Sequence, residues 1–265
     1  MLTVLDAVTV SEPAPGGAND DFLLVSGRWA LVLDGVSSYP VPDVGCQHTV
    51  PWFVGRLGLH LGYGLTTEPH KALPDLLADA IDRTTDEHGP GCDLTHPLTP
   101  ASTVAMVRLA DDRIDWLVLG DATVTWLMKD GTTEAVTDDR VDRLRDAPVI
   151  VADVRRYDPA FVAKIRNQPE GFWVAAADRA AAYESLTGSL PRAQVSAVGL
   201  LTDGVTRLVE RYDWTWRDVF DRANLYGPRH LIEAVRQAES TDPDPGRWRG
   251  KPHDDATAVI AYVTA

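Results

Sequence analysis

The sequence predicts an α+β protein in which antiparallel sheets are covered by helices. Apolar runs separated by turn residues, typical of β-hairpins, occur over residues 22–36 and 102–137. Segments with apolar residues at helical spacing occur over residues 43–89 and 206–240. A group of strands is followed by a group of helices, and this order occurs twice along the chain. Such an order indicates sheets with helices packed on their faces.

The first part of the chain divides into a hairpin and two helices. Residues 26–27 mark the hairpin turn, and the run "ALVLDGV" (30–36) has the unbroken apolar character of a buried strand. Residues 43–65 predict one helix, although several glycines weaken it. Residues 71–89 predict a second helix with Gly89 as its C-cap.

The second part begins with the strands expected at the centre of the sheet. Residues 102–137 predict three or four antiparallel strands, with turns at 111–112 and 129–131. The pattern over 138–182 is the least regular, with short helical patches between loops. The remaining elements are a buried strand, three helical segments and a final strand, at residues 195–205, 206–212, 215–223, 228–240 and 254–264.

Composition limits the location and the partners of the protein. Its 265 residues, 45% of them hydrophobic, are enough for a single domain over residues 1–265. The net charge of -14 argues against a nucleic-acid partner, because phosphate backbones are bound by clustered Lys and Arg. No apolar run reaches the roughly 18 residues of a membrane span, and no signal-like segment begins the sequence. Two cysteines suit a reducing compartment, so a cytoplasmic location is expected.

Acidic residues lie at the edges of four predicted strands, at Asp20-Asp21, Asp34-Gly35, Asp203-Gly204 and Asp254-Asp255. Carboxylates at strand ends can converge at one rim of a sheet, and hard divalent cations prefer such oxygen ligands. A glycine after an aspartate lets the backbone carbonyl approach the same ion. Two metals that share a water lower its pKa and present hydroxide to phosphorus. The sequence therefore predicts a metal centre built from strand ends.

Six short motifs occur in the order found in one enzyme family. They are "NDD" (19–21), "VLDGV" (32–36), "STVAMV" (102–107), "LGDA" (119–122), "LLTDGV" (200–205) and "DDATAVI" (254–260). Each motif alone is weak, since Asp-Gly is a common turn dipeptide. Together they span almost the whole chain. In these motifs the chain resembles the metal-dependent protein phosphatases of type 2C, and it looks like a divergent, bacterial-type member of that family.

This resemblance implies a fold and an activity. The fold is a central antiparallel β-sandwich flanked by helices on both sides. The activity is hydrolysis of phosphoserine and phosphothreonine in proteins, by in-line attack of a hydroxide that bridges two Mg²⁺ or Mn²⁺ ions. The expected partner is therefore a phosphorylated protein. A monomer that binds neither nucleic acid nor membrane is expected.

The resemblance also assigns roles to the catalytic residues. Asp34 would bridge both metals, and the Gly35 carbonyl would bind one of them. Asp203 and Asp254 would complete the shell of the other metal. Asp34, Asp203 and Asp254 are thus the predicted catalytic residues.

Three further aspartates match the family as supporting metal-site residues. Asp20 and Asp21 match its N-terminal acidic pair, which orients metal-bound water. Asp121, in "LGDA", matches an aspartate that helps to hold a third, weaker metal.

Three positions depart from the family pattern. No Arg or Lys occurs over residues 1–21, where many members carry a phosphate-binding arginine, and the nearest candidate, Arg28, is expected to be solvated. Val36 stands where many members have a histidine general acid, and His48 is a candidate substitute. Asp255 replaces the usual asparagine of the last motif, which is compatible with tighter cation binding or with a supporting role.

The sequence leaves substrate choice open. Residues 166–183 occupy the place of the family's variable flap and depart from its pattern, with Phe172 and Trp173 expected in the core. A small-molecule phosphate is therefore an alternative substrate. A phosphatase-like binding module with weak or no activity is a second alternative, which the missing arginine and Val36 support and the intact aspartates oppose.

Cysteine and histidine positions suggest one more alternative, a zinc site. Cys46 and His48, together with Cys92 and His96, resemble parts of structural zinc sites, but no CxxC motif occurs. The two halves are expected to lie far apart, on a helix and on a loop. The sequence therefore disfavours a zinc site.

Overall fold

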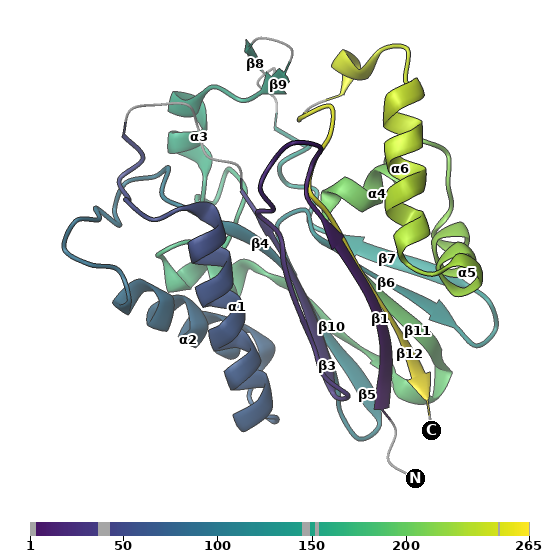
Figure 1. Ribbon diagram of the computed structural model, residues 1–265. Helices are drawn as coiled ribbons and strands as arrows, with labels where there is room; N and C mark the ends of the chain where they lie inside the picture. Colours follow the sequence, from purple (N-terminus) through teal and green to yellow (C-terminus); the bar gives the residue numbers. More distant parts are fainter. Residues whose placement is uncertain (1–3, 37–42, 145–148, 152–153, 249, 265) are drawn as a thin grey trace.

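Two five-stranded antiparallel sheets pack face to face in this computed structural model, and helices cover the outer face of each sheet (Figure 1). The structure describes residues 4–36, 43–144, 149–151, 154–248 and 250–264. The predicted α+β class and the predicted helix-flanked β-sandwich are both confirmed.

Both sheets combine strands from distant parts of the chain. In spatial order, the first sheet consists of β1 (Val4–Glu12), β12 (Ala256–Thr264), β11 (Val195–Leu201), β6 (Thr123–Met128) and β7 (Thr133–Thr137). The second sheet consists of β10 (Leu186–Pro191), β5 (Arg113–Leu119), β4 (Ser102–Leu109), β3 (Trp29–Gly35) and β2 (Phe22–Val25). A separate pair is formed by β8 (Val149–Val151) and β9 (Val154–Arg156).

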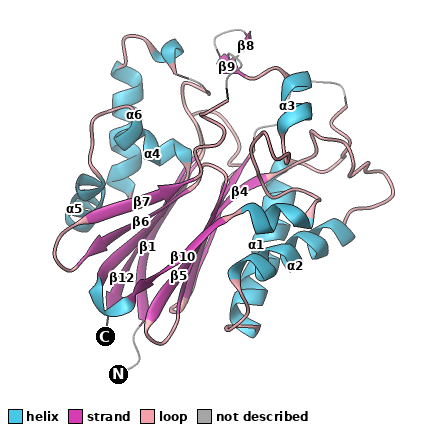
Figure 2. Cartoon of the chain, turned by 180° about the vertical axis from the view of Figure 1, so that it is seen from behind, coloured by secondary structure: helices cyan, strands magenta, loops and turns pink. Residues whose placement is uncertain are grey.

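The helices form the two outer layers. The second sheet is covered by α1 (Val50–Thr67) and α2 (Leu73–Asp86). The first sheet is covered by α4 (Asp203–Glu210), α5 (Trp216–Tyr226) and α6 (Arg229–Thr241), as Figure 2 shows from behind. A short helix, α3 (Pro159–Ile165), lies among the loops at one edge of the sandwich. Among the described residues, no helix has the length and apolar character that crossing a bilayer requires.

Strand β3 shows how the sequence supplies two hydrophobic layers at once. Leu31 and Leu33 pack with α1 and α2, whereas Ala30 and Val32 pack between the two sheets, and all four are at most 1% exposed. Successive side chains of a strand point to opposite faces, so an unbroken apolar run is required where both faces are buried. The unbroken run that predicted a buried strand therefore reflects its position between a helix layer and a second sheet.

The two predicted N-terminal helices are present with different ends. Helix α1 begins at Val50, because the Thr49 hydroxyl accepts a hydrogen bond from the Trp52 amide (3.3 Å) and caps it. The expected start at residue 43 is therefore wrong. Helix α2 ends at Asp86, so the prediction of Gly89 as its C-cap is also wrong.

Four strands were not predicted: the pair β8 and β9, where short helical patches were expected, and the strands β1 and β10. β1 pairs with β12 over its whole length, from Val4 opposite Thr264 to Glu12 opposite Ala256. β10 pairs with β5 in antiparallel fashion, from Leu186 opposite Val118 to Pro191 opposite Arg113. Both are edge strands with many exposed side chains, so their sequences lack the long apolar run that marked the central strands.

Gly58 and Gly55 give a matched test of the packing of α1. A Cβ on Gly58 would lie 2.3 Å from Phe22 Cε1, whereas a Cβ on Gly55 would meet nothing within 4 Å. Overpacking by Gly58→Ala should lower the free energy of unfolding by about 1–3 kcal/mol. Gly55→Ala should raise it by about 0.5–1 kcal/mol, because Gly is a poor helix former. Denaturant titration measures both, and equal effects would contradict the close contact of α1 with the sheet.

Candidate metal centre

The predicted catalytic aspartates lie where strands of both sheets end at one edge of the sandwich. Asp34 and Gly35 close β3, Asp203 begins α4 directly after β11, and Asp254 lies just before β12. Strands β11 and β12 are paired, and β3 contacts both of them across the sandwich. The antiparallel pairing therefore delivers the three carboxylates to the same edge, which is the upper one in Figure 1.

Asp34 is at the centre of a carboxylate cluster. Burial raises its pKa well above the usual range, and the nearby carboxylates of Asp21, Asp203, Asp254 and Asp121 raise it further. The Asp203 amide also donates a hydrogen bond to Asp34 Oδ2 (3.4 Å). The structure thus brings together five aspartates that the sequence had assigned to the metal site.

Asp21 keeps one carboxylate oxygen available inside this cluster. Its Oδ2 accepts a hydrogen bond from Thr202 Oγ1 (3.0 Å), while its Oδ1 is buried with no hydrogen-bond partner in the described structure. Burial raises the pKa of Asp21 to about 8, although the nearby hydroxyl groups of Thr257 and Thr202 act to lower it. A buried carboxylate oxygen without a donor is costly unless a cation or an ordered water occupies its lone pairs.

Asp255 fixes the N-terminal acidic pair. Its Oδ1 accepts from the Ala14 amide (2.7 Å) and its Oδ2 from the Asp20 amide (2.8 Å). Burial and the Asp255 carboxylate raise the pKa of Asp20, whereas Lys251 lowers it. Both Asp255 oxygens are thus used as backbone acceptors, which favours the supporting interpretation of this residue over direct cation binding.

Two glycines let the backbone close around the cluster. A Cβ on Gly35 would lie 2.5 Å from the Asp20 carbonyl oxygen, and a Cβ on Gly204 would lie 1.9 Å from the Asp255 carbonyl oxygen. Any larger residue at either position would separate segments that carry site aspartates. Gly204 lies in the first turn of α4, so its main contribution is close packing of that helix against the segment before β12.

Two cations that no sequence motif marked contact the cluster. Arg207 is 0% exposed, and its Nη2 lies 3.0 Å from Asp254 Oδ2 and 3.7 Å from Asp203 Oδ2. Lys251 Nζ donates to the other oxygen of Asp254 (3.0 Å). Burial acts to lower the pKa of Arg207, but Asp203, Asp254 and Glu239 outweigh it and raise the pKa, so the guanidinium stays charged. The i, i+4 spacing of Asp203 and Arg207 on α4 was the available sequence signal.

Asp121 links the cluster to a cavity. It follows Gly120, whose φ of +76° turns the chain sharply between β5 and β6. Asp121 and Asp203 line a hollow of about 340 Å³ together with Arg211 and Trp248. A ligand in this hollow would therefore lie beside the carboxylates.

The donor set fits hard divalent cations around Asp34. It consists of carboxylate and backbone oxygens, it includes the unpartnered Oδ1 of Asp21, and its carboxylates repel one another. The fit is weaker at Asp254, since Arg207 and Lys251 already occupy its two oxygens. An ion bound there would have to displace or share these contacts.

The residues named for the phosphate clamp and the general acid lie elsewhere. Arg28 is in the turn between β2 and β3, at the far end of β3 from Gly35, with a side chain 46% exposed and 3.8 Å from Asp111. Its predicted solvated state is confirmed. His48 directs its Nδ1 at two sulfur atoms, so its predicted use as a general acid receives no support.

Val36 and the predicted flap form a small apolar cluster beside the site. Val36 packs against Ala101 and Val174, and its amide donates to the Ala101 carbonyl (2.9 Å). Phe172 packs against the same cluster, and Trp173 is 8% exposed in the core under α1 and α2. The core interpretation is therefore confirmed for Trp173, whereas Phe172 is only partly buried and lines a small hollow together with Val36 and Asp121.

The cysteine and histidine positions contradict one expectation from the sequence. Cys46 and His48 lie in the loop before α1, Cys92 lies in the loop after α2, and the three side chains are in contact. The expectation that the two halves lie far apart was wrong, because the α1–α2 hairpin brings the two loops to the same end.

Comparison with known proteins connects this geometry to one family. The family model for protein phosphatase 2C matches residues 14–236, which is well over half of the chain. None of the curated proteins matches the chain.

Solved structures of bacterial phosphatases share the fold. The serine/threonine phosphatase PstP/Ppp of Mycobacterium tuberculosis is 15% identical with a TM-score of 0.61, over 99% of this chain and 100% of that chain. The catalytic domain of PstP with two manganese ions is 16% identical with a TM-score of 0.59, over 100% of both chains. Stp1 of Staphylococcus aureus is 12% identical with a TM-score of 0.60, over 98% of this chain and 96% of that chain.

The clustered carboxylates predict an unusual pH dependence of stability without metal. The pKa of Asp21 is raised to about 8 in the folded protein, so its contribution is favourable at low pH and is lost as the pH rises through that value. With a chelator present, the midpoint of thermal unfolding should therefore fall between about pH 6 and about pH 8. Saturating Mn²⁺ should remove most of this fall, because the ion neutralises the carboxylates. A fall of equal size with and without Mn²⁺ would contradict the cluster as a cation site.

Proposed function

The chain belongs to the protein phosphatase 2C family, and we propose that it hydrolyses phosphoserine and phosphothreonine in proteins in a metal-dependent reaction. The observation that carries the proposal is the convergence of four other carboxylates on Asp34 at one edge of the sandwich. Such a concentration of negative charge destabilises a fold unless cations bind there. The cavity lined by Asp121 and Asp203 gives a phosphorylated side chain access to the same place.

We assign the metal-binding roles as follows. Asp34 and the Gly35 carbonyl would hold one divalent ion, and Asp34, Asp203 and Asp254 would hold a second. Bound there, Mg²⁺ or Mn²⁺ lowers the pKa of water and neutralises charge on the phosphoryl oxygens. Asp254 would hold an ion only if Arg207 or Lys251 gave up its contact with one of the two carboxylate oxygens.

The remaining acidic residues support this arrangement. The unpartnered Oδ1 of Asp21 accepts a hydrogen bond from water near the ions, and Asp20 lies beside it on the same loop. Asp255 keeps that loop in position through two backbone hydrogen bonds. Asp121, at the wall of the cavity, contributes to a third and weaker ion.

Lys251 is our candidate for the missing phosphate-binding arginine. Its ammonium contacts Asp254 and acts electrostatically on Asp20 and Asp255, so it lies over the cluster, and its side chain is 31% exposed. If Asp254 held a metal ion, the Lys251 ammonium would be free to donate to a phosphate oxygen. Metal binding and substrate binding would then be coupled.

Cellular location and assembly stay predictions. A cytoplasmic monomer with a signalling role fits the sequence composition and the proposed reaction. The two alternatives, a small-molecule phosphatase and an inactive binding module, are distinguished by the activity measurements below.

Asp34→Asn should reduce Mn²⁺-dependent hydrolysis of p-nitrophenyl phosphate and of phosphopeptides by at least about 100-fold, since several kcal/mol of transition-state stabilisation is lost. Asp203→Ala should behave in the same way. Asp86→Asn, at the exposed end of α2, is the matched control and should keep wild-type rates. Turnover of the small substrate alone would favour the small-molecule alternative. Absence of metal-dependent turnover of both substrates would contradict the proposed activity and favour the binding module.

Lys251→Met should change substrate and metal binding in opposite directions. The KM for a phosphopeptide should rise about tenfold with little change in kcat, because a charged hydrogen bond to the phosphate is lost. The Mn²⁺ concentration for half-maximal activity should fall, because Asp254 loses a competing cation. Lys129→Met, in the turn after β6, is the control. Unchanged KM would show that another residue holds the phosphate.

A further inference from the structure

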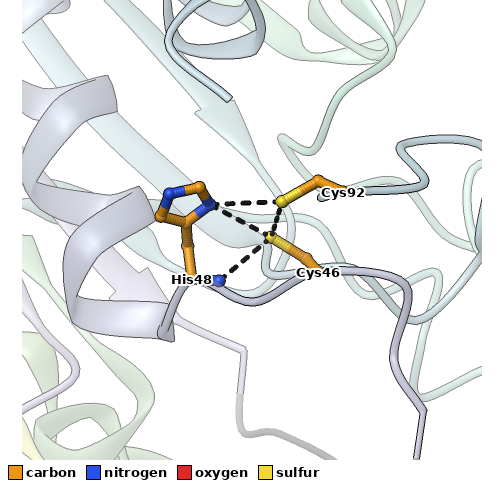
Figure 3. Close-up of side chains that lie close together, drawn as sticks. All are labelled: Cys46, His48 and Cys92. Carbon is orange, nitrogen blue, oxygen red and sulfur yellow. Dashed lines mark hydrogen bonds between the residues drawn. The ribbon is translucent and has the colours of Figure 1, made fainter. Parts of the chain in front are cut away.

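Three soft ligands lie together outside the carboxylate cluster. Cys46 and His48 precede α1 and Cys92 follows α2 (Figure 3). Cys46 Sγ lies 3.3 Å from Cys92 Sγ, and His48 Nδ1 lies 3.5 Å from Cys46 Sγ and 3.3 Å from Cys92 Sγ. The three ligand atoms therefore surround one point, as Figure 3 shows.

These separations are close to those around a tetrahedral zinc ion. With Zn–S near 2.3 Å and Zn–N near 2.0–2.1 Å, two sulfurs lie about 3.8 Å apart, and sulfur and nitrogen lie about 3.5 Å apart. A disulfide instead requires the two sulfurs, now 3.3 Å apart, to approach by about 1.2 Å. A small opening of the cluster thus suffices for an ion, and thiolate with imidazole is a ligand set that Zn²⁺ prefers.

The histidine is already oriented for coordination. Its ring stacks on Trp52 with centroids 3.9 Å apart and meets the edge of the His88 ring at 5.0 Å. The His48 amide also donates to Cys46 Sγ (3.3 Å), a hydrogen bond that stabilises a metal-bound thiolate.

Metal binding changes the protonation of the two thiols, which are both free in this structure. When a divalent ion binds, each S–H bond is replaced by a bond from sulfur to the metal, and each proton passes to solvent.

The backbone holds the two loops together next to the cluster. The Asp93 amide donates to the Gly45 carbonyl (2.6 Å), which joins the neighbours of Cys92 and Cys46. Gly45 has a φ of +75°, and a Cβ there would lie 2.2 Å from His96 Cβ. The ligands therefore need little rearrangement to bind an ion, which reduces the entropy cost of binding.

We propose that Cys46, His48 and Cys92 bind one Zn²⁺ ion, with a water molecule at the fourth tetrahedral position. The sequence suggested His96 as a fourth ligand, but its Nδ1 accepts a hydrogen bond from the Leu98 amide (3.2 Å). Among the described residues, these three are the only group of His, Cys, Asp or Glu side chains whose ligand atoms all lie within 4.8 Å of one another, so they form a more compact group than the carboxylates around Asp34.

The zinc ion would fix the framework near Asp34 without entering the reaction. It cross-links the loop that enters α1 to the loop that leaves α2. The second loop continues into Ala101 and Ser102. The Ala101 carbonyl accepts a hydrogen bond from the Val36 amide (2.9 Å), and the Ser102 hydroxyl donates one to the Asp34 carbonyl (3.0 Å). The ion thus acts as a structural brace, and its sulfur ligands distinguish it from ions bound by carboxylates.

Titration of the reduced, untagged protein with Co²⁺ tests the proposal independently of phosphatase activity. One equivalent of Co²⁺ should give thiolate-to-cobalt charge-transfer absorption and the d–d bands of a tetrahedral ion, and one equivalent of Zn²⁺ should remove both. Carboxylate-bound cobalt gives no thiolate band, so binding at Asp34 does not mimic this result. The midpoint of thermal unfolding should also rise with Zn²⁺.

Cys46→Ser and Cys92→Ser each remove one of the two sulfur ligands. Each variant should therefore lose the charge-transfer spectrum of a site with two thiolates and should bind Zn²⁺ at least about 100-fold more weakly. His48→Ala should weaken binding while keeping both sulfurs, and His96→Gln is the control that should bind as the wild type does. Circular dichroism of each metal-free variant verifies that it folds. The absence of a thiolate band in the reduced wild type, or wild-type binding by His48→Ala, would overturn the proposal. So would a Cys46–Cys92 disulfide that persists in reductant.

Discussion

The mutual repulsion of carboxylates at one edge of the sandwich is the constraint on which the rest of this structure depends. Asp34 faces four other carboxylates, and burial strengthens their interaction because little water screens it. Sheet pairing holds the strand ends in place despite this repulsion, since β3, β11 and β12 are hydrogen-bonded along their lengths. The fold thus concentrates negative charge at this edge, and the proposed binding of divalent cations would both neutralise it and raise the stability of the fold.

Part of this charge is balanced by the protein itself. Arg207 contacts Asp254 on one side and Glu239 on the other, at 3.0 Å and 2.8 Å. Glu239 is also bound by Arg236 (2.9 Å) and His253 (2.7 Å), so this buried network ties α4 and α6 to the edge that carries the aspartates. Burying such a network is costly unless every partner is present, and its value lies in fixing geometry more than in adding stability. A charged arginine under the site also means that fewer bound cations are needed for neutrality.

The two candidate metal sites use different chemistry on the same framework. Oxygen ligands gather at strand ends, where they suit Mg²⁺ or Mn²⁺, whereas sulfur and imidazole gather on two helix-connecting loops, where they suit Zn²⁺. The loops reach the end of β3 through the contacts of Val36 with Ala101 and of Asp34 with Ser102. In the proposed arrangement, mechanical support and reaction chemistry are thus assigned to different ligands.

The sequence by itself determined the α+β class, the central strands and the aspartates that end them, because local apolar periodicity and Asp-Gly turns are written in consecutive residues. The sandwich arrangement was expected only from the resemblance to the phosphatase family. Only the tertiary structure decided which distant groups meet. It placed Arg207 against Asp254, paired the edge strand β1 with β12, and brought the thiol of Cys46 beside that of Cys92 at one end of the α1–α2 hairpin. Such contacts depend on the path of the chain between elements, and hydrophobic periodicity carries no information about that path.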